Sequence, residues 1–292
     1  MTDWQRVAEQ IAAASGEPFQ PRPPRRLGGG CINQTVRLED DGRSWFVKLN
    51  RAELRDMFDA ERAGLEAMDA TATLRVPRPL CTGTAGGSSF IAMEYVPFGA
   101  PGPGGQRTAG LLLAAMHRAS AARFGWERDN TIGSTPQHNA WSDDWIGFWR
   151  EHRLGFQLEL AAAKGYGGRL QRLGARLLDA FPALIDHAPV PALLHGDLWG
   201  GNLGFDAAGG PVIFDPATYY GDREAELAMT ELFGGFTADF YAAYREAWPL
   251  DPGYGVRKTL YNLYHILNHL NLFGGGYASQ AEAMMTRLLA EL

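Results

Sequence analysis

Residues 192–217 read ALLHGDLWGGNLGFDAAGGPVIFDPA, and this stretch holds the pattern that decides the fold. Two short apolar runs, ALL and VIF, each end in polar residues, and glycine and other turn residues lie between them. Short apolar runs bounded by turn residues predict strands, so we expect a hairpin that carries polar groups at its ends. Those polar groups belong to the HGDLWGGN loop, His195 to Asn202, and to Asp215.

Three of these residues have the chemistry of a phosphoryl-transfer centre. Asn202 follows Asp197 by five residues, and Asp215 follows Asn202 by thirteen. Phosphoryl transfer needs a carboxylate that orients the acceptor hydroxyl, and oxygen ligands that hold Mg²⁺ against the phosphates. The spacing reproduces the H-x-D-x-x-x-x-N loop of protein kinases, with Asp215 in the place of their D-F-G aspartate. The structural alternative is that these residues only cap turns, as Asp and Asn often do.

The residues upstream of this stretch predict a β-rich region. An amphipathic, polar-capped N-terminal segment predicts a helix, and the proline-rich stretch 18–24 interrupts regular structure after it. The alternating segments QTVRL and SWFVKL, separated by DDGR, predict a two-stranded hairpin. A helix is expected over residues 52–68, and VPRPLCTGTAGGSSFIAMEYV predicts two further strands around a glycine-rich turn.

The segment FGAPGPGG, residues 98–105, is the candidate hinge of the chain. Its glycines and prolines exclude both helix and strand. Beyond it, apolar residues recur at intervals of three and four, from GLLLAAMHRA to AEAMMTRLLAEL, which predicts a mainly helical region. We therefore expect an α+β protein with a β-rich N-terminal lobe, residues 1–97, and a mainly helical C-terminal lobe, residues 98–292.

The first lobe contains residues suited to a nucleotide. Gly28, Gly29 and Gly30 allow a phosphate chain to approach the backbone closely. Lys48 on the next strand can supply the cation for the α- and β-phosphates, and Glu61 on the predicted helix can pair with it. Each feature alone is equally consistent with a flexible turn or a solvated side chain. Together with the downstream residues they predict that the protein uses ATP and Mg²⁺.

The strand FIAMEYVPFG, residues 90–99, runs directly into the candidate hinge. In a two-lobed kinase this strand offers backbone donors and acceptors to the adenine edge. The main-chain groups of Glu94 and Val96 are therefore candidates for nucleotide contacts. A core strand that ends at a linker is the alternative, and both interpretations can hold together.

Composition narrows the classes of partner. A formal charge of −6 over 292 residues argues against a nucleic-acid partner. Two cysteines, Cys31 and Cys81, are too few for a disulfide framework and lack the spacing of a zinc site. No apolar stretch reaches the roughly 20 residues that span a bilayer, and the N-terminus lacks a signal-peptide pattern. We expect a cytoplasmic protein, a monomer or weak dimer, without a membrane partner.

Four stretches make the chain similar to the fructosamine/ketosamine-3-kinase family. They are LGGGCINQ, HGDLWGGN, DPATYYGDREAELAMTELFGGF and FGWERDNTIGSTPQHNAWSDDWIGFWREHRL. The resemblance extends from about Leu27 to Phe273, and HGDLWxGN combined with YYGxRE is its most specific part. That family belongs to the aminoglycoside-phosphotransferase-like branch of the protein-kinase fold, so the resemblance implies a two-lobed protein-kinase-like fold.

The resemblance also implies an activity. It is ATP-dependent phosphorylation of the third-carbon hydroxyl of a ketosamine, either a small molecule or a glycated lysine, and the unstable product then releases the free amine. Carried over by position, Asp197 would be the catalytic base, and Asn202 and Asp215 the Mg²⁺ ligands. Lys48 would be the phosphate cation, with Glu61 as its partner.

The same comparison assigns loops and aromatic residues. The loop from Gly28 through Cys31 and Ile32 to Asn33 would cover the nucleotide. A separate hypothesis is redox control, in which oxidation of the Cys31 thiol would block the entry of ATP. Substrate contacts are predicted for Trp199, His195 and Asp222. Asp222 stands where we would expect a histidine in much of the family.

Further aromatic and histidine residues have two interpretations. Trp141, Trp145 and Trp149 can stack on a sugar or its amine-bearing tail, and Asp143 and Asp144 can meet a cationic amine, although tryptophans at helical spacing are more often core residues. His117, His265 and His269 show no metal-ligand spacing and are interpreted as ordinary helix residues.

Two other functions remain open at this stage. One is a kinase for another small hydroxyl compound, such as an aminoglycoside, choline or a sugar. The other is a nucleotide-binding regulatory protein without catalysis, although all the polar groups expected for transfer are present.

Overall fold

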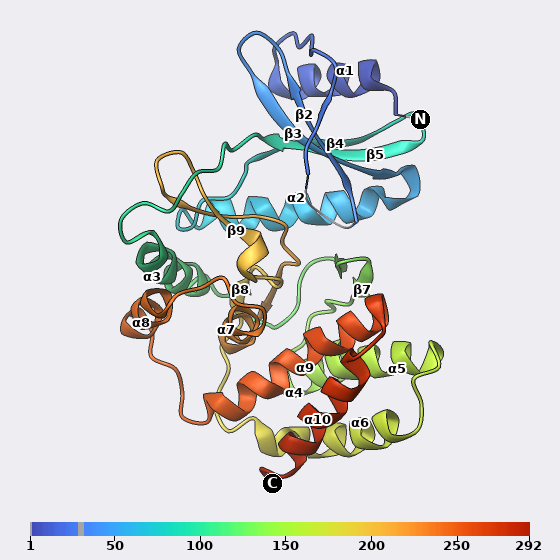
Figure 1. Ribbon diagram of the computed structural model, residues 1–292, viewed down its shortest axis with the longest axis vertical. Coiled ribbons are helices and arrows are strands. Elements are labelled where there is room, and N and C mark those ends of the chain that lie inside the picture. The colour runs from blue at the N-terminus through green and yellow to red at the C-terminus, as the bar shows by residue number, and fades with distance from the viewer. Residues whose placement is uncertain (1, 29–31) are drawn as a thin grey trace. The chain divides into compact units, whose positions relative to one another are not determined.

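The computed structural model describes residues 2–28 and 32–292, and the chain forms two compact units (Figure 1). The first comprises residues 1–105 with 203–216, and the second comprises residues 106–202 with 217–292. The expected lobes, 1–97 and 98–292, differ from these units mainly in the segment 203–216. That segment is a hairpin that packs on the first unit although its flanking residues belong to the second.

The first unit is built on a five-stranded antiparallel sheet in the order β1-β2-β3-β5-β4. Its strands are β1 (Arg25–Arg26), β2 (Gln34–Glu39), β3 (Ser44–Arg51), β4 (Pro79–Ala85) and β5 (Ser88–Glu94). The β2–β3 hairpin is the one predicted from QTVRL and SWFVKL. The Asp40 carboxylate closes its turn by accepting from the Gly42 and Arg43 amides at 3.2 and 2.9 Å.

Two helices cover opposite faces of this sheet (Figure 1). Helix α1 (Trp4–Ser15) starts where Asp3 caps the Arg6 amide and ends at Gly16 in the left-handed conformation. Its apolar stripe forms a buried core with Val47 and Leu49 of β3. Helix α2 (Arg55–Ala70), preceded by the short turn η1 (Ala52–Leu54), covers the other face. Because strand side chains alternate, Lys48 points to the α2 face.

The hairpin β9–β10 belongs to the first unit and ends just before Asp215. It consists of β9 (Leu203–Phe205) and β10 (Pro211–Ile213), which pair antiparallel. Arg75 fastens it twice, because its guanidinium contacts Asp206 at 2.5 Å and its carbonyl accepts from the Ile213 amide at 3.0 Å. This contact fixes the position of the Asp215 backbone relative to the sheet that carries Lys48.

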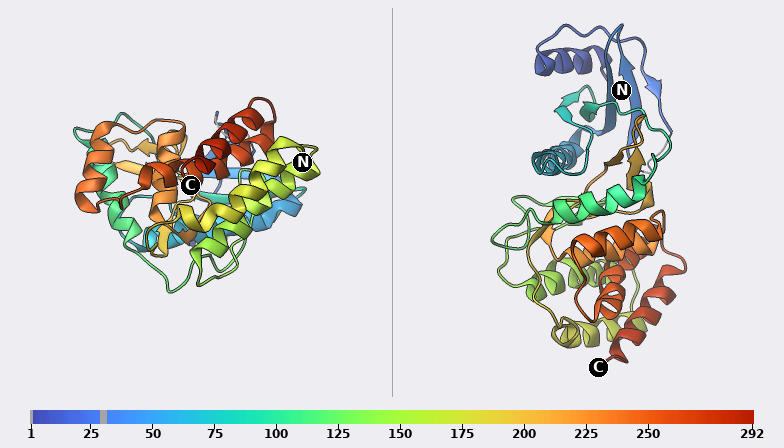
Figure 2. Two further views of the ribbon diagram at one scale, coloured as in Figure 1. Left: turned by 90° about the horizontal axis from the view of Figure 1, so that it is seen from below. Right: turned by 90° about the vertical axis from the view of Figure 1, so that its left-hand side faces the viewer.

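The second unit is mainly helical. Its helices are α3 (Gly105–His117), α4 (Trp145–Trp149), the π-helix η2 (Arg150–Gly155), α5 (Phe156–Ala163), α6 (Arg169–Ala180), η3 (Phe181–Leu184), η4 (Gly200–Asn202), α7 (Arg223–Leu232), α8 (Ala238–Ala247), α9 (Tyr254–Phe273) and α10 (Tyr277–Leu289). Helix α9 is buried along most of its length and packs against α5, α7 and α10 (Figure 2). It forms the centre of this unit.

Four short strands complete the second unit: β6 (Asn130–Ile132), β7 (Thr135–Gln137), β8 (Ala192–Leu194) and β11 (Tyr219–Gly221). The sequence predicted one hairpin over the stretch 192–217. The apolar run ALL instead forms β8, which pairs with β11, while VIF lies in the separate β9–β10 hairpin. The prediction of strands was correct, but the partner of β8 was not visible because YYG carries too weak a strand pattern.

Helix α7 was not among the predicted helices. Its residues Arg223 to Thr230 are all buried, and Arg223, Glu224 and Glu226 are charged. A helix with charged residues on buried positions has no clean apolar stripe, so the three-and-four periodicity does not appear. Among the described residues, no helix is long and apolar enough to cross a membrane.

A buried pair of His187 and Asp222 lies at the start of α7. Asp222 caps the helix by accepting from the Glu224 amide at 3.0 Å, and it contacts His187 Nε2 at 2.8 Å. Burial alone would lower the pKa of His187, but the hydrogen bond and charge of Asp222 raise it overall. Asp222 itself has a lowered pKa, because His187 and Tyr261 outweigh the effect of burial. The charged pair therefore forms when His187 is protonated.

We predict that the stabilising effect of His187 depends on pH. A raised folded-state pKa means that the contribution is complete below the unfolded pKa, about 6.5, and is lost as pH rises through the folded value. His187→Gln should lower the free energy of unfolding by about 1.5 to 3 kcal/mol near pH 5.5 and by less near pH 8.5. Denaturant titrations at both pH values measure the difference.

The matched control is His138, which pairs with Asp129 on the surface with side chains 43% and 58% exposed. His138→Gln should change stability by less than about 1 kcal/mol at either pH. A stability loss in His187→Gln that is the same at pH 5.5 and 8.5 would contradict the prediction.

Candidate active site

An ion cluster joins β3, α2 and the turn after β10 in the first unit. Lys48 Nζ donates to Glu61 Oε1 at 2.6 Å and also to the Asp215 carboxylate. The Lys48 and Glu61 side chains are almost fully buried, whereas Asp215 is 48% exposed. The structure therefore brings the distant Asp215 to Lys48 and Glu61, and it confirms the predicted Lys48–Glu61 pair.

The charges in this cluster depend on one another. Burial opposes the charge of Lys48, but Glu61 and Asp215 outweigh it and raise the Lys48 pKa. Burial raises the pKa of Glu61, and the nearby Asp215 adds to the rise while Lys48 opposes it. Lys48 is thus a permanent cation, held between one buried carboxylate and one that remains open to solvent.

Asp215 has an unusual backbone. Its φ is +65°, in the left-handed region that residues other than glycine seldom adopt. Aspartate tolerates this region better than most residues, and such conformations recur at functional sites. The turn follows the end of β10 and directs the carboxylate to Lys48.

The described ends of the glycine-rich loop are fastened to the sheet. The Leu27 amide donates to the Thr35 carbonyl at 3.0 Å, and Asn50 Nδ2 of β3 donates to Asn33 Oδ1 at 2.8 Å. Gly28 and Ile32 are exposed between these anchors. Gly29, Gly30 and Cys31, including the redox hypothesis for the thiol, lie outside the described residues.

The strand β5 ends at the predicted adenine contacts. The Glu94 amide donates to the Arg78 carbonyl at 2.8 Å, and the Glu94 carboxylate contacts Arg75 at 2.6 Å. A nucleotide contact at Glu94 would therefore have to use its carbonyl oxygen. Val96 follows as a mostly buried residue just before residues 98–105.

The second unit carries the HGDLWGGN loop. Asn202 Nδ2 donates to the Asp197 carbonyl at 2.8 Å and to Asp197 Oδ2 at 3.4 Å. The Asn202 amide donates to the Trp199 carbonyl at 2.9 Å, which closes the short turn η4. The spacing of five residues thus makes a closed loop in which the side-chain amide of Asn202 binds the Asp197 carboxylate.

Gly196 is required by the path of this loop. Its φ is +85°, and a Cβ atom there would lie 2.0 Å from the Ala217 carbonyl oxygen. The Ala217 amide in turn donates to the His195 carbonyl at 2.8 Å. Steric contact with the returning chain therefore explains the glycine between His195 and Asp197.

Glu226 of α7 anchors the loop and was missed in the sequence. Its carboxylate accepts from the His195 amide at 3.0 Å and from the Gly196 amide at 2.7 Å, and it contacts His117 Nε2 at 2.8 Å. Burial alone would raise the pKa of Glu226, but His117, His195 and the Gly196 amide lower it. The anchor is an ionised carboxylate. The only sequence signal was a charged residue within the stretch DPATYYGDREAELAMTELFGGF.

The structure separates the candidate tryptophans. Trp145 and Trp149 are buried against Tyr261 and are core residues. Trp199 is 40% exposed and Trp141 is 36% exposed, so the stacking prediction remains for these two.

Asp143 and Asp144, which directly precede Trp145, both contact other residues of the protein. Asp143 contacts Arg123 at 3.0 Å. Asp144 caps α4 by accepting from the Ile146 and Gly147 amides at 3.0 and 2.8 Å. Capping and a surface ion pair therefore account for both carboxylates, which leaves little support for contact with a substrate amine.

His195 and Asp222 are placed as supporting residues. The His195 side chain is fully buried, and its Nδ1 accepts from the Asp197 amide at 3.3 Å. Asp222 is buried between His187 and Tyr261. Both residues therefore favour a role in holding the backbone over the substrate contact that the sequence suggested, because neither side chain is open to solvent.

The fold is of the protein-kinase-like phosphotransferase class. A crystal structure from Haemophilus somnus, named as that of a fructosamine-3-kinase, matches with a TM-score of 0.90 and 28% identity, covering 99% of this chain and 98% of that one. The likeness to an aminoglycoside phosphotransferase, with a TM-score of 0.62 and 15% identity, supports the fold alone.

The chain belongs to the fructosamine kinase family, whose model matches residues 3–291. It is 51% identical over 287 residues to a probable ketoamine kinase of Synechocystis, covering 98% of this chain and 97% of the relative. It is 46% identical over 270 residues to the chloroplastic protein-ribulosamine 3-kinase of Arabidopsis thaliana, covering 91% of this chain and 82% of the relative.

We predict that Lys48→Met destabilises the first unit strongly. The change leaves the buried Glu61 carboxylate beside Asp215 without a cation, and breaking a buried pair by removing one partner typically costs 3 to 5 kcal/mol. Because burial raises the pKa of Glu61, the penalty should shrink as pH falls toward 5 and Glu61 takes up a proton. Denaturant unfolding of the variant at pH 5 and pH 8 measures both effects.

Two variants serve as controls. Lys48→Met with Glu61→Gln removes both charges and should recover part of the loss. Arg62→Met breaks an exposed pair with Glu66 on the same helix and should cost about 0 to 1 kcal/mol. Equal losses in Lys48→Met and Arg62→Met would contradict the prediction.

Proposed function

We propose that this protein is an ATP-dependent kinase that phosphorylates the 3-hydroxyl of ketosamines, such as fructosamine or ribulosamine adducts, and so promotes deglycation. The observation that carries the proposal is the Lys48–Glu61–Asp215 cluster in a chain of the fructosamine kinase family that also keeps the closed Asp197–Asn202 loop. The names of the relatives, ketoamine kinase and protein-ribulosamine 3-kinase, support the substrate class.

Lys48 would bind the α- and β-phosphates of ATP. Its charge is fixed by the two carboxylates, and Glu61 holds the ammonium at a defined place on β3. Asp215 is the more exposed of its two partners and can exchange Lys48 for another cation. The backbone from Gly28 to Asn33 and the main chain of Glu94 and Val96 would hold the rest of the nucleotide.

Asn202 and Asp215 would hold Mg²⁺. Magnesium takes oxygen ligands, and this pair offers an amide carbonyl and a carboxylate. The amide nitrogen of Asn202 donates to Asp197, so its carbonyl oxygen is the atom that would serve a metal. The donor set therefore fits the ion. When bound, Mg²⁺ neutralises charge on the β- and γ-phosphate oxygens.

Asp197 would orient the acceptor hydroxyl and take its proton. Two hydrogen bonds orient this carboxylate and its loop: the Asn202 side-chain amide donates to Asp197 Oδ2, and the Asp197 backbone N–H donates to His195 Nδ1. Trp199, two residues further on and partly exposed, would stack on the sugar or its amine-bearing tail. A cytoplasmic location and a monomeric or weakly dimeric state remain predictions from the sequence.

We predict that Asp197→Asn abolishes most of the activity without unfolding the protein. A positioned base contributes on the order of 10² to 10⁴ in rate, or roughly 3 to 5 kcal/mol of transition-state stabilisation. The variant should bind ATP as the wild type does, because Lys48, Glu61 and Asp215 are unchanged. Turnover measured alongside the unfolding midpoint tests this, and a folded variant with wild-type turnover would rule out Asp197 as the base.

We further predict that the wild-type protein transfers phosphate to carbon 3 of a synthetic ketosamine. Phosphorus NMR of ATP, Mg²⁺ and either a ribulosamine or a fructosamine should show a new sugar phosphate and ADP. Choline, an aminoglycoside and free ribose serve as comparison acceptors. Faster transfer to one of these than to either ketosamine would replace the proposed substrate class.

A further inference from the structure

A chain of buried hydrogen bonds extends from the HGDLWGGN loop into the helices behind it. Glu226 accepts from the two loop amides and contacts His117 Nε2 at 2.8 Å. The other ring nitrogen of His117, Nδ1, lies 2.8 Å from the Tyr244 hydroxyl. Arg223 NH1 donates to the same hydroxyl at 3.4 Å. His117 of α3 and Tyr244 of α8 thus connect the loop to elements far from it in sequence.

The donors and acceptors of this chain can be assigned from its two ends. An ionised carboxylate only accepts, so the proton between Glu226 and His117 sits on Nε2. A guanidinium only donates, so the Tyr244 oxygen accepts from Arg223 at 3.4 Å. The Tyr244 hydroxyl also lies within hydrogen-bond distance of His117 Nδ1. The bonds at the two ends of the chain therefore have fixed directions: Arg223 donates to Tyr244, and His117 donates to the Glu226 carboxylate.

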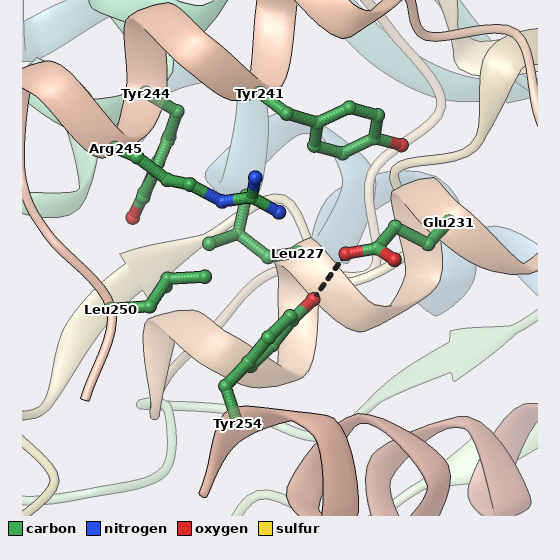
Figure 3. Close-up of a pocket in the computed structure, with 7 residues that line it drawn as sticks. All are labelled: Leu227, Glu231, Tyr241, Tyr244, Arg245, Leu250 and Tyr254. Atoms are coloured by element: carbon green, nitrogen blue, oxygen red, sulfur yellow. Dashed lines mark hydrogen bonds between the residues drawn. The ribbon is translucent and has the colours of Figure 1, made fainter. Parts of the chain in front are cut away.

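The surroundings leave the Tyr244 hydroxyl few other partners. Figure 3 shows Tyr244 at the edge of a small pocket with its hydroxyl turned away from Glu231. In that pocket Glu231 is bonded to the Tyr254 hydroxyl at 2.8 Å and to Lys258 at 2.6 Å. The Glu231 carboxylate therefore binds Tyr254 and Lys258, and the Tyr244 hydroxyl contacts His117, which leads to Glu226.

We propose that His117 is a positioning residue for the phosphoryl transfer, acting through Glu226 on the backbone of His195 and Gly196 with its ring held in place by Tyr244. The inference rests on the proposed function of Asp197. His117 touches none of the loop directly in these bonds; it holds the one carboxylate that accepts both amides preceding Asp197. Without the imidazole donor, the Glu226 carboxylate is buried with one partner fewer and can shift or take up a proton, which loosens the loop.

The position of the HGDLWGGN loop should depend on the N–H group that residue 117 donates to Glu226 rather than on the shape of its side chain. His117→Leu removes the donor to Glu226, while His117→Gln keeps a side-chain N–H donor and an acceptor for Tyr244. A misplacement of about 1 Å at a catalytic group can cost up to about 10²-fold in rate. We expect kcat to fall by roughly 10- to 100-fold in His117→Leu, with KM for ATP within twofold, and to recover most of the loss in His117→Gln.

Tyr244→Phe tests the contribution of the Tyr244 hydroxyl. It removes the hydroxyl that contacts His117 Nδ1 and Arg223 while the Glu226 contact of His117 is kept, so it should give a smaller loss of kcat than His117→Leu. The control is Tyr261→Phe, which removes an equally buried phenol of the same unit that donates to Asp222 at 2.5 Å and accepts from Trp145. Tyr261→Phe should lower stability but leave kcat within about twofold.

A second measurement separates this inference from the proposed function. Amide hydrogen exchange, followed by mass spectrometry on peptides that span 193–199, needs no acceptor substrate. Exchange should be faster in His117→Leu than in His117→Gln and unchanged in Tyr261→Phe. If ketosamines are not phosphorylated at all, the proposed function fails while the exchange result still judges the positioning role.

Two results would overturn the inference. One is unchanged loop exchange in a folded His117→Leu protein. The other is a loss of kcat in Tyr261→Phe that equals the loss in His117→Leu at the same loss of stability, since that would make the effect a general one of a weakened core.

Discussion

A charged side chain that is buried away from water needs an oppositely charged or hydrogen-bonding partner, and this constraint applies in both units of the protein. In the first unit, Lys48 is buried and keeps its charge because Glu61 and Asp215 reach it from α2 and from the turn after β10. In the second, Glu226 is buried and ionised because two loop amides and His117 donate to it. Each buried charge thereby fixes the elements that supply its partners.

This arrangement explains how a short loop can hold the Asp197 carboxylate in place. Loops are usually more mobile than the elements they connect. Here the amides of His195 and Gly196 end on Glu226, and the left-handed turn at Gly196 brings the chain against Ala217. These contacts restrict the loop although it contains glycine at three positions between 195 and 202. Rigidity of this kind is what orientation of an acceptor hydroxyl requires.

Part of the site could be predicted because phosphate chemistry demands certain residue types at short spacings. Asp197 and Asn202 lie on one loop, and Lys48 and Glu61 lie on a strand and the helix that follows it, so local sequence was enough. The partners of His117 and Asp222 could not be predicted for the opposite reason. A histidine on an apolar helix and an aspartate before a helix look alike whether they face solvent, substrate or a buried carboxylate, and only their distant partners decide.

The sequence by itself determined the β-rich first unit, the amphipathic helices and the acids of the phosphoryl-transfer loop, because alternation, periodicity and motif spacing are properties of neighbouring residues. Tertiary structure decided the rest. The pairing of β8 with β11, the buried charges of α7 and the bond from His117 to Glu226 join residues 25 or more positions apart. Such contacts depend on which distant residues the folded chain brings to each buried charge, and the pattern of neighbouring residues in the sequence does not show this.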